Sequence, residues 1–137
     1  MFLIDSMSRQ PVYEQLIEQL ERFVLTGVLK PGDQMPSVRS LSMELSINPN
    51  TIQKAYSELD SRRLIYSVPG RGCFISENAL PLISEQKREK LAVLDRLLEE
   101  LALAGVEEPT VREHVRKAYE QRRGDIHDSS DPSDQTV

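Results

Sequence analysis

A helical apolar pattern in residues 31–59 is broken by Ser46-Ile47-Asn48-Pro49, and this break constrains the fold most. Proline disfavours helical geometry in the residue before it but fits the first position of a new helix, and asparagine is a good N-cap. Before the break, Val38, Leu41 and Leu45 recur at helical spacing after a potential cap at Ser37. The pattern therefore predicts two short helices joined by a tight turn.

The second of these helices has one apolar face and one polar face. Its expected buried stripe is Ile52, Ala55, Tyr56 and Leu59, and its expected outward residues are Asn50, Thr51, Gln53, Lys54 and Ser57. No Asp or Glu occurs from Leu45 to Ser57. The outward face is therefore suited to contact with a polyanion.

Composition limits the possible function classes. With 137 residues and 39% hydrophobic content, the chain can form one small core and an accessory segment, which excludes a large catalytic fold. The net charge of −5 means that any contact with phosphate must come from a local basic patch. The negative charge is concentrated after residue 78, where the sequence contains thirteen acidic and nine basic residues.

Several chemistries lack the residues they need. Cys73 is the only cysteine, and neither His114 nor His127 has partners at metal-ligand spacing. No nucleophile-base pair, phosphate loop, signal-like N-terminus or long apolar run is present. We therefore expect no catalytic residue, metal or cofactor, a structural role for Cys73 instead of redox sensing, and a soluble cytoplasmic protein.

Two further patterns complete the first part of the chain. An apolar stripe runs from Pro11 to Gly27 and predicts a long helix, preceded by Phe2-Leu3-Ile4 as a short strand or apolar clasp. Short apolar runs at 64–68 and 73–76, separated by Pro69-Gly70-Arg71-Gly72, predict a hairpin. Three helices followed by a hairpin form a winged helix-turn-helix, a DNA-reading motif, and Arg71 at the hairpin tip suits a phosphate backbone or minor groove.

Several motifs follow one another in residues 31–75: Pro31-Gly32-Asp33, Met35-Pro36-Ser37-Val38-Arg39, Leu41, Asn48-Pro49-Asn50-Thr51, Ala55-Tyr56, Leu59 and Gly70-Arg71-Gly72-Cys73-Phe74-Ile75. In this order they resemble the DNA-binding domain of the GntR family of bacterial transcription regulators. The start Pro11-Val12-Tyr13-Glu14-Gln15-Leu16 and the short tail resemble the YtrA subfamily. The resemblance implies a homodimer that binds operator DNA, repression, and control of a neighbouring transporter operon.

The resemblance and the residue types together predict the DNA-binding residues. They are Arg39, Asn48, Asn50, Thr51, Gln53, Lys54, Gly70, Arg71 and Gly72. Arg39 suits bidentate contact with phosphate or guanine, Gln53 could read adenine, and Lys54 suits the DNA backbone. Many family members have arginine at the positions of Pro49 and Gln53, so their base contacts do not transfer to this chain.

Other roles are open for some of these residues. Arg39 could form a surface ion pair with Glu44 or Glu58, and Arg62-Arg63 suits the C-terminal end of its helix better than base contact. We expect Tyr13, Tyr56 and Phe74 to lie in the core. The alternative function is a winged-helix adaptor that binds protein without reading DNA. Such an adaptor would have no reason to exclude acidic residues from the outward face of the helix after Asn48 while keeping Glu14, Glu18 and Glu21 on the helix after Pro11.

The tail has a leucine pattern of its own. Leu91, Leu94, Leu98 and Leu101 form an a/d seam in a helix expected over 84–104, broadened by Leu97 and ended by Gly105. A capping box at Thr110 predicts a second helix to about residue 122 with Val111, Val115, Ala118 and Tyr119 on one face. The seam is too short for an isolated coiled coil, so we expect this hairpin to pack on that of a second subunit; a tail folded onto its own domain is the alternative.

The sequence therefore predicts a mainly α protein with a small β-hairpin. Residues 1–78 form the winged helix-turn-helix domain, residues 79–123 the two-helix dimerisation tail, and residues 124–137 a disordered acidic end. The predicted function is a sequence-specific DNA-binding transcriptional regulator that binds a pseudo-palindromic operator as a homodimer, without a membrane partner. A ligand cavity has little room in such a tail, but a small-molecule effector, which the sequence does not identify, could still bind at the dimer interface.

Overall fold

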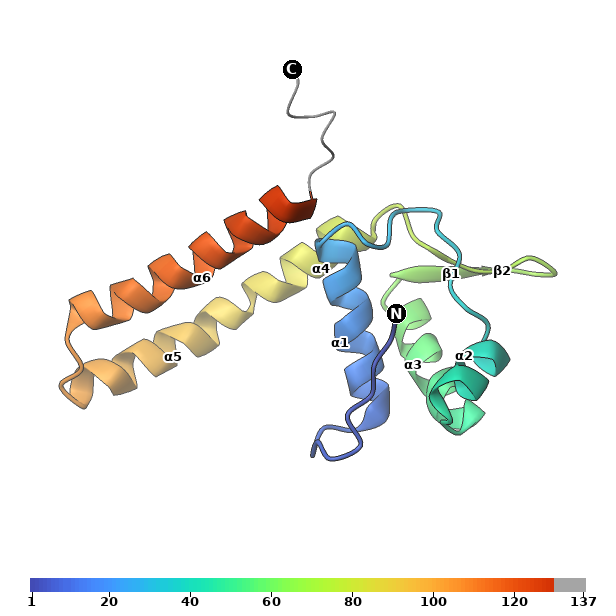
Figure 1. Cartoon of the computed structure of the whole chain (residues 1–137), viewed down its shortest axis with the longest axis horizontal. Coiled ribbons are helices and arrows are strands. Elements are labelled where there is room, and N and C mark those ends of the chain that lie inside the picture. Colours follow the sequence, from blue (N-terminus) through green and yellow to red (C-terminus); the bar gives the residue numbers. More distant parts are fainter. Residues whose placement is uncertain (130–137) are drawn as a thin grey trace, which may run out of the picture. The chain divides into compact units, whose positions relative to one another are not determined.

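A computed structural model describes residues 1–129 and divides the chain into two compact units, Met1–Arg88 and a second that begins at Glu89. The first unit contains helices α1 (Val12–Leu25), α2 (Val38–Leu45) and α3 (Pro49–Ser61), strands β1 (Ile65–Val68) and β2 (Gly72–Ile75), and helix α4 (Ala79–Arg88) (Figure 1). This is a winged helix-turn-helix, so the predicted mainly α class with a hairpin is confirmed.

The core of the first unit lies between the three helices and the hairpin. The residues at its centre expose less than 2% of their surface: Leu20, Leu41, Ile52, Leu59, Leu64, Ile75 and Ile83. The strands pair antiparallel from Ile65 opposite Ile75 to Val68 opposite Gly72. Phe74 is half-buried and stacks on Tyr66 at 5.7 Å between ring centroids, outside the core that we expected it to join.

The break between α2 and α3 has the predicted caps. The Ser37 side chain accepts a hydrogen bond from the Ser40 amide at 3.0 Å, and the Asn48 side chain accepts one from the Asn50 amide at 2.8 Å. Pro49 occupies the first turn of α3. Ser46 ends α2 in the left-handed conformation (φ 56°), which turns the chain sharply enough to place α3 against α2.

The end of α3 turns the chain into the hairpin through a Schellman motif. The amide of Leu64 donates to the Leu59 carbonyl at 3.0 Å, and the amide of Arg63 donates to the Asp60 carbonyl at 2.9 Å. This motif places Arg63 in the left-handed conformation (φ 65°), where glycine is normally found.

Replacing Arg63 with glycine should therefore stabilise the fold. Relief of the left-handed penalty of about 1–2 kcal/mol exceeds the entropy that glycine adds to the unfolded chain, about 0.4–1 kcal/mol. We expect a rise of about 1 kcal/mol or slightly less in the free energy of unfolding, measured by urea titration. Arg62→Gly is the control and should destabilise, because Arg62 has a right-handed φ of −81° and pairs with Glu58.

A short segment before α2 extends the hairpin, which the sequence pattern did not predict. Gln34 forms an isolated antiparallel bridge with Phe74, the Met35 amide donates to the Cys73 carbonyl at 2.7 Å, and the Ile75 amide donates to the Asp33 carbonyl at 2.8 Å. The wing is therefore held by three segments of chain, which ties its position to that of α2.

The N-terminal segment forms the apolar clasp and not the strand that we considered. Phe2 is buried, with its ring 5.3 Å from that of Phe23 in an edge-on arrangement. The buried Gln15 side chain accepts from the Asp5 amide at 2.9 Å and donates to the carbonyls of Asp5 and Gln10. One side chain of α1 thus satisfies three backbone groups of the irregular segment.

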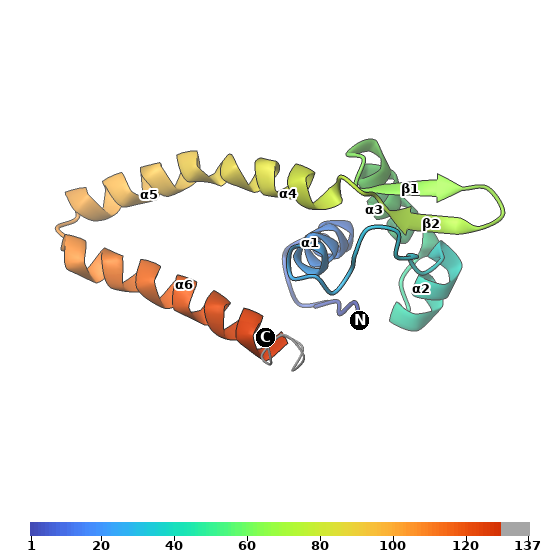
Figure 2. The same cartoon turned by 90° about the horizontal axis from the view of Figure 1, so that it is seen from above.

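Helix α4 belongs to the first unit, whereas the predicted domain boundary lay before it, after residue 78. Ala79 and Ile83 are fully buried against the core, and α4 packs beside α1 (Figure 2). The helix expected over 84–104 is divided at Glu89. Helix α4 has only a short run of apolar residues at helical spacing. From sequence alone, this run could not be distinguished from the start of the leucine seam that follows it.

The second unit contains α5 (Lys90–Leu103) and α6 (Glu108–Ser129). Gly105 ends α5 in the left-handed conformation (φ 82°), as predicted. The prediction that a capping box at Thr110 starts the second tail helix is wrong. Helix α6 begins at Glu108, because Pro109 fits a first helical turn. The disordered end predicted from residue 124 is also wrong as far as Ser129, because α6 continues to that residue; residues 130–137 lie outside the described part of the chain.

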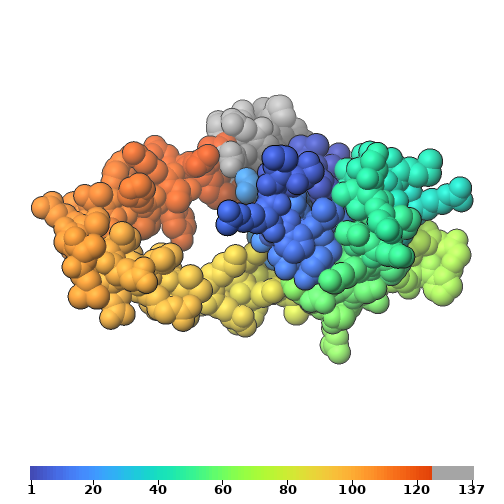
Figure 3. Space-filling model, turned by 90° about the horizontal axis from the view of Figure 1, so that it is seen from below, coloured from blue at the N-terminus to red at the C-terminus, as the bar shows by residue number. Residues whose placement is uncertain are grey.

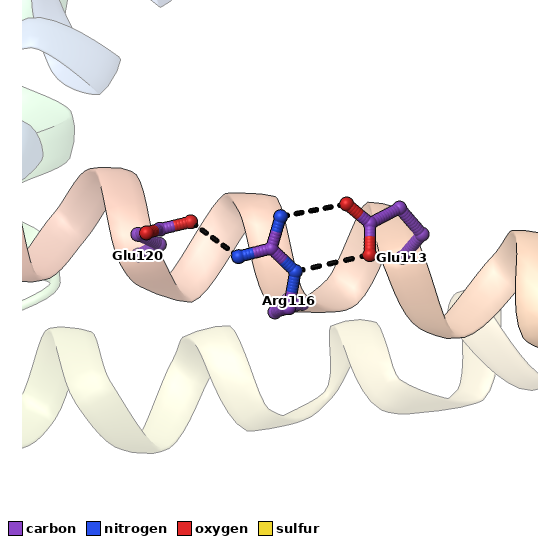
Figure 4. Close-up of polar contacts among 3 residues, drawn as sticks. All are labelled: Glu113, Arg116 and Glu120. Atoms are coloured by element: carbon purple, nitrogen blue, oxygen red, sulfur yellow. Dashed lines mark hydrogen bonds and ion pairs between the residues drawn. The ribbon is translucent and has the colours of Figure 1, made fainter.

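Ion pairs at helical spacing support the extended α6. Figure 4 shows the Arg116 guanidinium binding both oxygens of Glu113, at 3.0 and 2.6 Å, and Glu120 at 2.6 Å. The hydrogen bonds from Arg116 hold the pKa of Glu113 below its usual value. None of the helices in residues 1–129 has the length and apolar character needed to cross a membrane.

Candidate nucleic-acid interface

The N-terminal turn of α3 presents short polar side chains at the positive end of the helix dipole. Asn50 is exposed and Thr51 is half-buried, and the first turn of α3 contains no acidic residue. The positive end of a helix dipole attracts anions. The first-turn amides of Asn50, Thr51 and Ile52 already donate to Asn48, so hydrogen bonds to phosphate would come from the side chains. Asn48 has a capping role here, because its side-chain oxygen already accepts from Asn50.

A groove joins α3 to the wing. Its volume is about 430 Å³, and its polar lining from α3 is Gln53, Ser57 and Asp60, facing Ser67, Gly70 and Gly72 of the hairpin. Within the groove the Gln53 amide nitrogen donates to the Ser57 hydroxyl at 3.1 Å. This bond leaves the amide oxygen and the second amide hydrogen of Gln53 available, which is the pair of groups that reads adenine.

The tip of the wing is a tight turn that displays Arg71. The Arg71 amide donates to the Val68 carbonyl at 2.9 Å, with proline and then glycine (φ 76°) between them, as in a type II turn. Gly72 has a φ of 119°, and a Cβ atom there would lie 2.7 Å from the Gln34 side-chain nitrogen. That nitrogen donates to the Arg71 carbonyl at 2.9 Å, so Gln34 fixes the backbone while the guanidinium stays exposed.

Arg39 lies on the first turn of α2 and is exposed. One of the two carboxylates that could have paired with it, Glu58, is bound to Arg62 at 2.9 Å. Among the described residues no ion pair involves Arg39 or Arg71. In the space-filling view α2 and the wing are both visible at one end of the first unit (Figure 3). The groove lining includes Ser37 and Val38, which precede Arg39, together with Gly70 and Gly72, which flank Arg71.

The structure places Lys54 differently from the other candidates. Its ammonium lies 3.9 Å from the centre of the Tyr13 ring, on the side of α3 that faces α1. A cation over an aromatic face is stabilised by about 0.5–1 kcal/mol at exposed sites. Lys54 therefore links α1 to α3 and points away from the groove that Gln53 lines.

Sequence reasoning missed three residues of this surface. Ser57 was recognised only as exposed, Asp60 lies just beyond the acid-free segment, and Gln34 reaches the wing across 37 positions of sequence. No local pattern signals a contact over that separation. Asp60 places one negative charge at the far end of the groove, so the surface suited to phosphate ends near Ser57.

Two reactive groups beside the groove are held in neutral forms. The Tyr56 hydroxyl donates to the Pro36 carbonyl at 2.6 Å, and burial raises the pKa of Tyr56. Burial likewise raises the pKa of the half-buried Cys73 thiol. A protonated thiol is a poor nucleophile, in agreement with the structural role expected for Cys73.

The tail residues predicted for dimerisation are not covered by their own unit. Leu91, Leu94 and Leu101 expose 57%, 44% and 40% of their surfaces, and Val115 and Tyr119 expose 49% and 66%. Leu98 and Val111 are half-buried. No residue of α5 is buried, so the described part of the second unit leaves most of the leucine seam exposed.

Comparison with known proteins identifies what this arrangement resembles. The family of bacterial regulatory proteins described as the gntR family matches residues 12–75. The chain is 39% identical to the HTH-type transcriptional repressor YtrA of Bacillus subtilis over 90% of this chain and 96% of that protein.

Solved structures agree in fold. A transcriptional regulator from Oenococcus oeni superposes with a TM-score of 0.68 and 34% identity, covering 87% of this chain and 99% of that one. A GntR family transcriptional regulator from Listeria monocytogenes gives a TM-score of 0.67 and 28% identity, covering 83% and 98%. The similarity therefore extends beyond the winged domain into the tail.

Proposed function

The chain belongs to the GntR family of bacterial regulatory proteins, in its YtrA-like subfamily, and from this premise we propose that it represses transcription as a homodimer on a pseudo-palindromic operator. Membership of the family makes it a DNA-binding transcriptional regulator. The repressor role, the dimer and the form of the operator are the parts that we propose, together with a cytoplasmic location.

One observation carries the proposed reading surface. Gln53 and Ser57 on the polar face of α3 line the same groove as Gly70 and Gly72, the two glycines on either side of Arg71. A helix suited to the major groove therefore lies next to a wing whose tip carries a cation suited to the neighbouring backbone. We propose the side chains of Arg39, Asn50, Thr51 and Arg71 as phosphate or base contacts, with Gln53 as the reader of a base. Asn48, Gly70 and Gly72 act by shaping the backbone, and Lys54 by bracing α3.

The exposed seam of the tail supports the homodimer. Exposure of a leucine stripe at a/d spacing to water is unfavourable in free energy. A second copy of the chain carries an identical stripe of the same length that could cover it. A symmetric dimer would then present two α3 helices to half-sites about 34 Å apart, which is one turn of DNA. This division assigns reading to residues 1–88 and pairing to the unit that begins at Glu89.

The experiment that tests this function starts from random duplexes. The full chain is used to select binding sequences from a random library, and the result is compared with DNA upstream of its own gene in a gel shift. We expect an inverted repeat with half-site centres about 10 base pairs apart, and an affinity that falls steeply with salt. If selection enriches no sequence, the adaptor that does not read DNA becomes the better description.

Replacing Gln53 with alanine should change base preference and not general affinity. The amide is neutral, so its loss removes no phosphate attraction, whereas a bidentate contact contributes about 1–3 kcal/mol of discrimination at one base pair. The measurement is binding to duplexes that carry each of the four base pairs at each half-site position. An unchanged preference at every position would show that Gln53 reads no base.

A further inference from the structure

Helix α1 contains a buried carboxylate that the proposed DNA contacts do not use. Glu21 exposes only 4% of its surface, and its Oε2 atom is fully removed from solvent. The Lys87 ammonium on α4 lies 3.0 Å from this atom. Among the described side chains none makes a hydrogen bond of good geometry to Oε2, so the charge of Lys87 is what compensates this atom.

A buried ion pair between two helices needs closely defined geometry to be stable. Removing a carboxylate from water is unfavourable by several kcal/mol unless a cation stays close, and apolar residues of similar size often pack as well or better. A buried ion pair is therefore weak evidence for stability, but it accepts a narrower set of arrangements than apolar contacts do. Here it restricts where Lys87, and with it the last turn of α4, can lie.

The Glu21–Lys87 pair lies at the end of the first unit, where the chain passes into the tail. Ala79 and Ile83 anchor the start of α4 by apolar packing, which tolerates small rotations and shifts. Lys87 continues the same face one turn later, immediately before the chain enters the second unit at Glu89. The ion pair thus lies at the end of the first unit, two residues before the second unit begins.

We propose that Glu21 is a positioning residue: with Lys87 it fixes the final turn of α4, and this sets the spacing at which the two winged domains of a dimer engage their half-sites. The inference rests on the homodimer proposed above. It adds a specificity for half-site spacing that does not depend on any contact between Glu21 and DNA.

The test variant is Glu21→Gln, which removes the buried charge and leaves the partly exposed Lys87 in reach of water, so the fold is retained. The probes are the selected inverted-repeat duplex and versions with one or two base pairs inserted between half-sites. Wild-type affinity should fall by about 100-fold on insertion, because the second domain no longer reaches its half-site. For Glu21→Gln this drop should shrink to less than about tenfold, and affinity for the original spacing should fall.

Three controls separate positioning from general stability. Glu18→Gln makes the same change on the exposed face of α1 and should keep the wild-type spacing profile. The exchanged pair Glu21→Lys with Lys87→Glu should restore part of the preference. Hydrogen exchange of the α4 amides should accelerate in Glu21→Gln, whereas affinity for a duplex with a single half-site should stay unchanged.

The outcomes distinguish this inference from the proposed function. A dimeric Glu21→Gln variant with the wild-type spacing profile overturns the positioning role and leaves the function intact. A wild-type chain that sediments as a monomer, or that binds one half-site as tightly as two, overturns both.

Discussion

Introducing aspartate at both Leu94 and Leu101 should convert the protein to a monomer and lower its operator affinity by about 10²–10⁴-fold. The two leucines expose 44% and 40% of their surfaces in the single chain, so the substitutions leave its own core untouched. In a paired seam the same positions would bury four uncompensated carboxylates, which no dimer of this size can tolerate. Sedimentation at micromolar concentration and binding to the selected duplex measure the two effects.

The same helix supplies the matched control. Leu103 is 83% exposed and lies off the a/d seam, so Leu103→Asp adds the same charge without entering the interface. Affinity for a single half-site should be unchanged in all three proteins, because the reading surface is intact. A double variant that remains dimeric would show that the leucine seam is not the dimer interface.

Truncation is a poorer test of the dimer than these point variants. A chain cut near Asn78, at the boundary expected from sequence, would lose Ala79 and Ile83, which are fully buried in the first unit. It would also leave the Glu21 carboxylate without Lys87. The cut that removes the tail and keeps the core is after Arg88.

The reading domain could be predicted well from sequence because its determinants are local. Ser37, Asn48 and Pro49 act within one helical turn of themselves, and the glycines at 70 and 72 have the positive φ angles that the hairpin requires. The start of α6 was missed because two local signals competed. Pro109 in the first turn prevailed over the capping box at Thr110.

What could not be predicted depends on contacts between distant segments. The support of the wing by Gln34, the burial of Glu21 beside Lys87 and the position of Lys54 over Tyr13 join residues that no periodic pattern connects. Each of them changes a functional assignment. Lys54 becomes a brace, Gln34 becomes part of the wing, and α4 becomes part of the reading domain.

Replacing Arg39 with alanine should lower operator affinity by about 100-fold or more. A symmetric dimer loses one contact on each half-site, and a hydrogen bond to a charged group contributes about 1.5–3 kcal/mol. If the lost contacts are to phosphate, binding to random duplexes should weaken similarly and the slope of affinity against salt should decrease. Fluorescence anisotropy on both duplexes over a range of salt concentrations measures these quantities.

The fold itself should not suffer from this change, which makes the result interpretable. Arg39 carries a positive charge on the first turn of α2, where the helix dipole disfavours it and where no acidic residue compensates it. Arg39→Ala should therefore leave the free energy of unfolding equal or slightly higher. A loss of operator affinity in a variant whose stability is unchanged would therefore report a lost contact with DNA and not a damaged fold.

Two related variants define the kind of contact. Arg39→Lys keeps the charge but loses the planar guanidinium. If that group bonds bidentately to guanine, Arg39→Lys should recover more of the affinity lost in Arg39→Ala on random duplexes than on the operator. Arg62→Ala removes an arginine that is already paired with Glu58 at the far end of α3 and should change affinity by no more than about twofold. Operator affinity that is untouched in a folded Arg39→Ala protein would mean that α2 faces away from DNA, and the docking orientation proposed for α3 and the wing would have to be reversed.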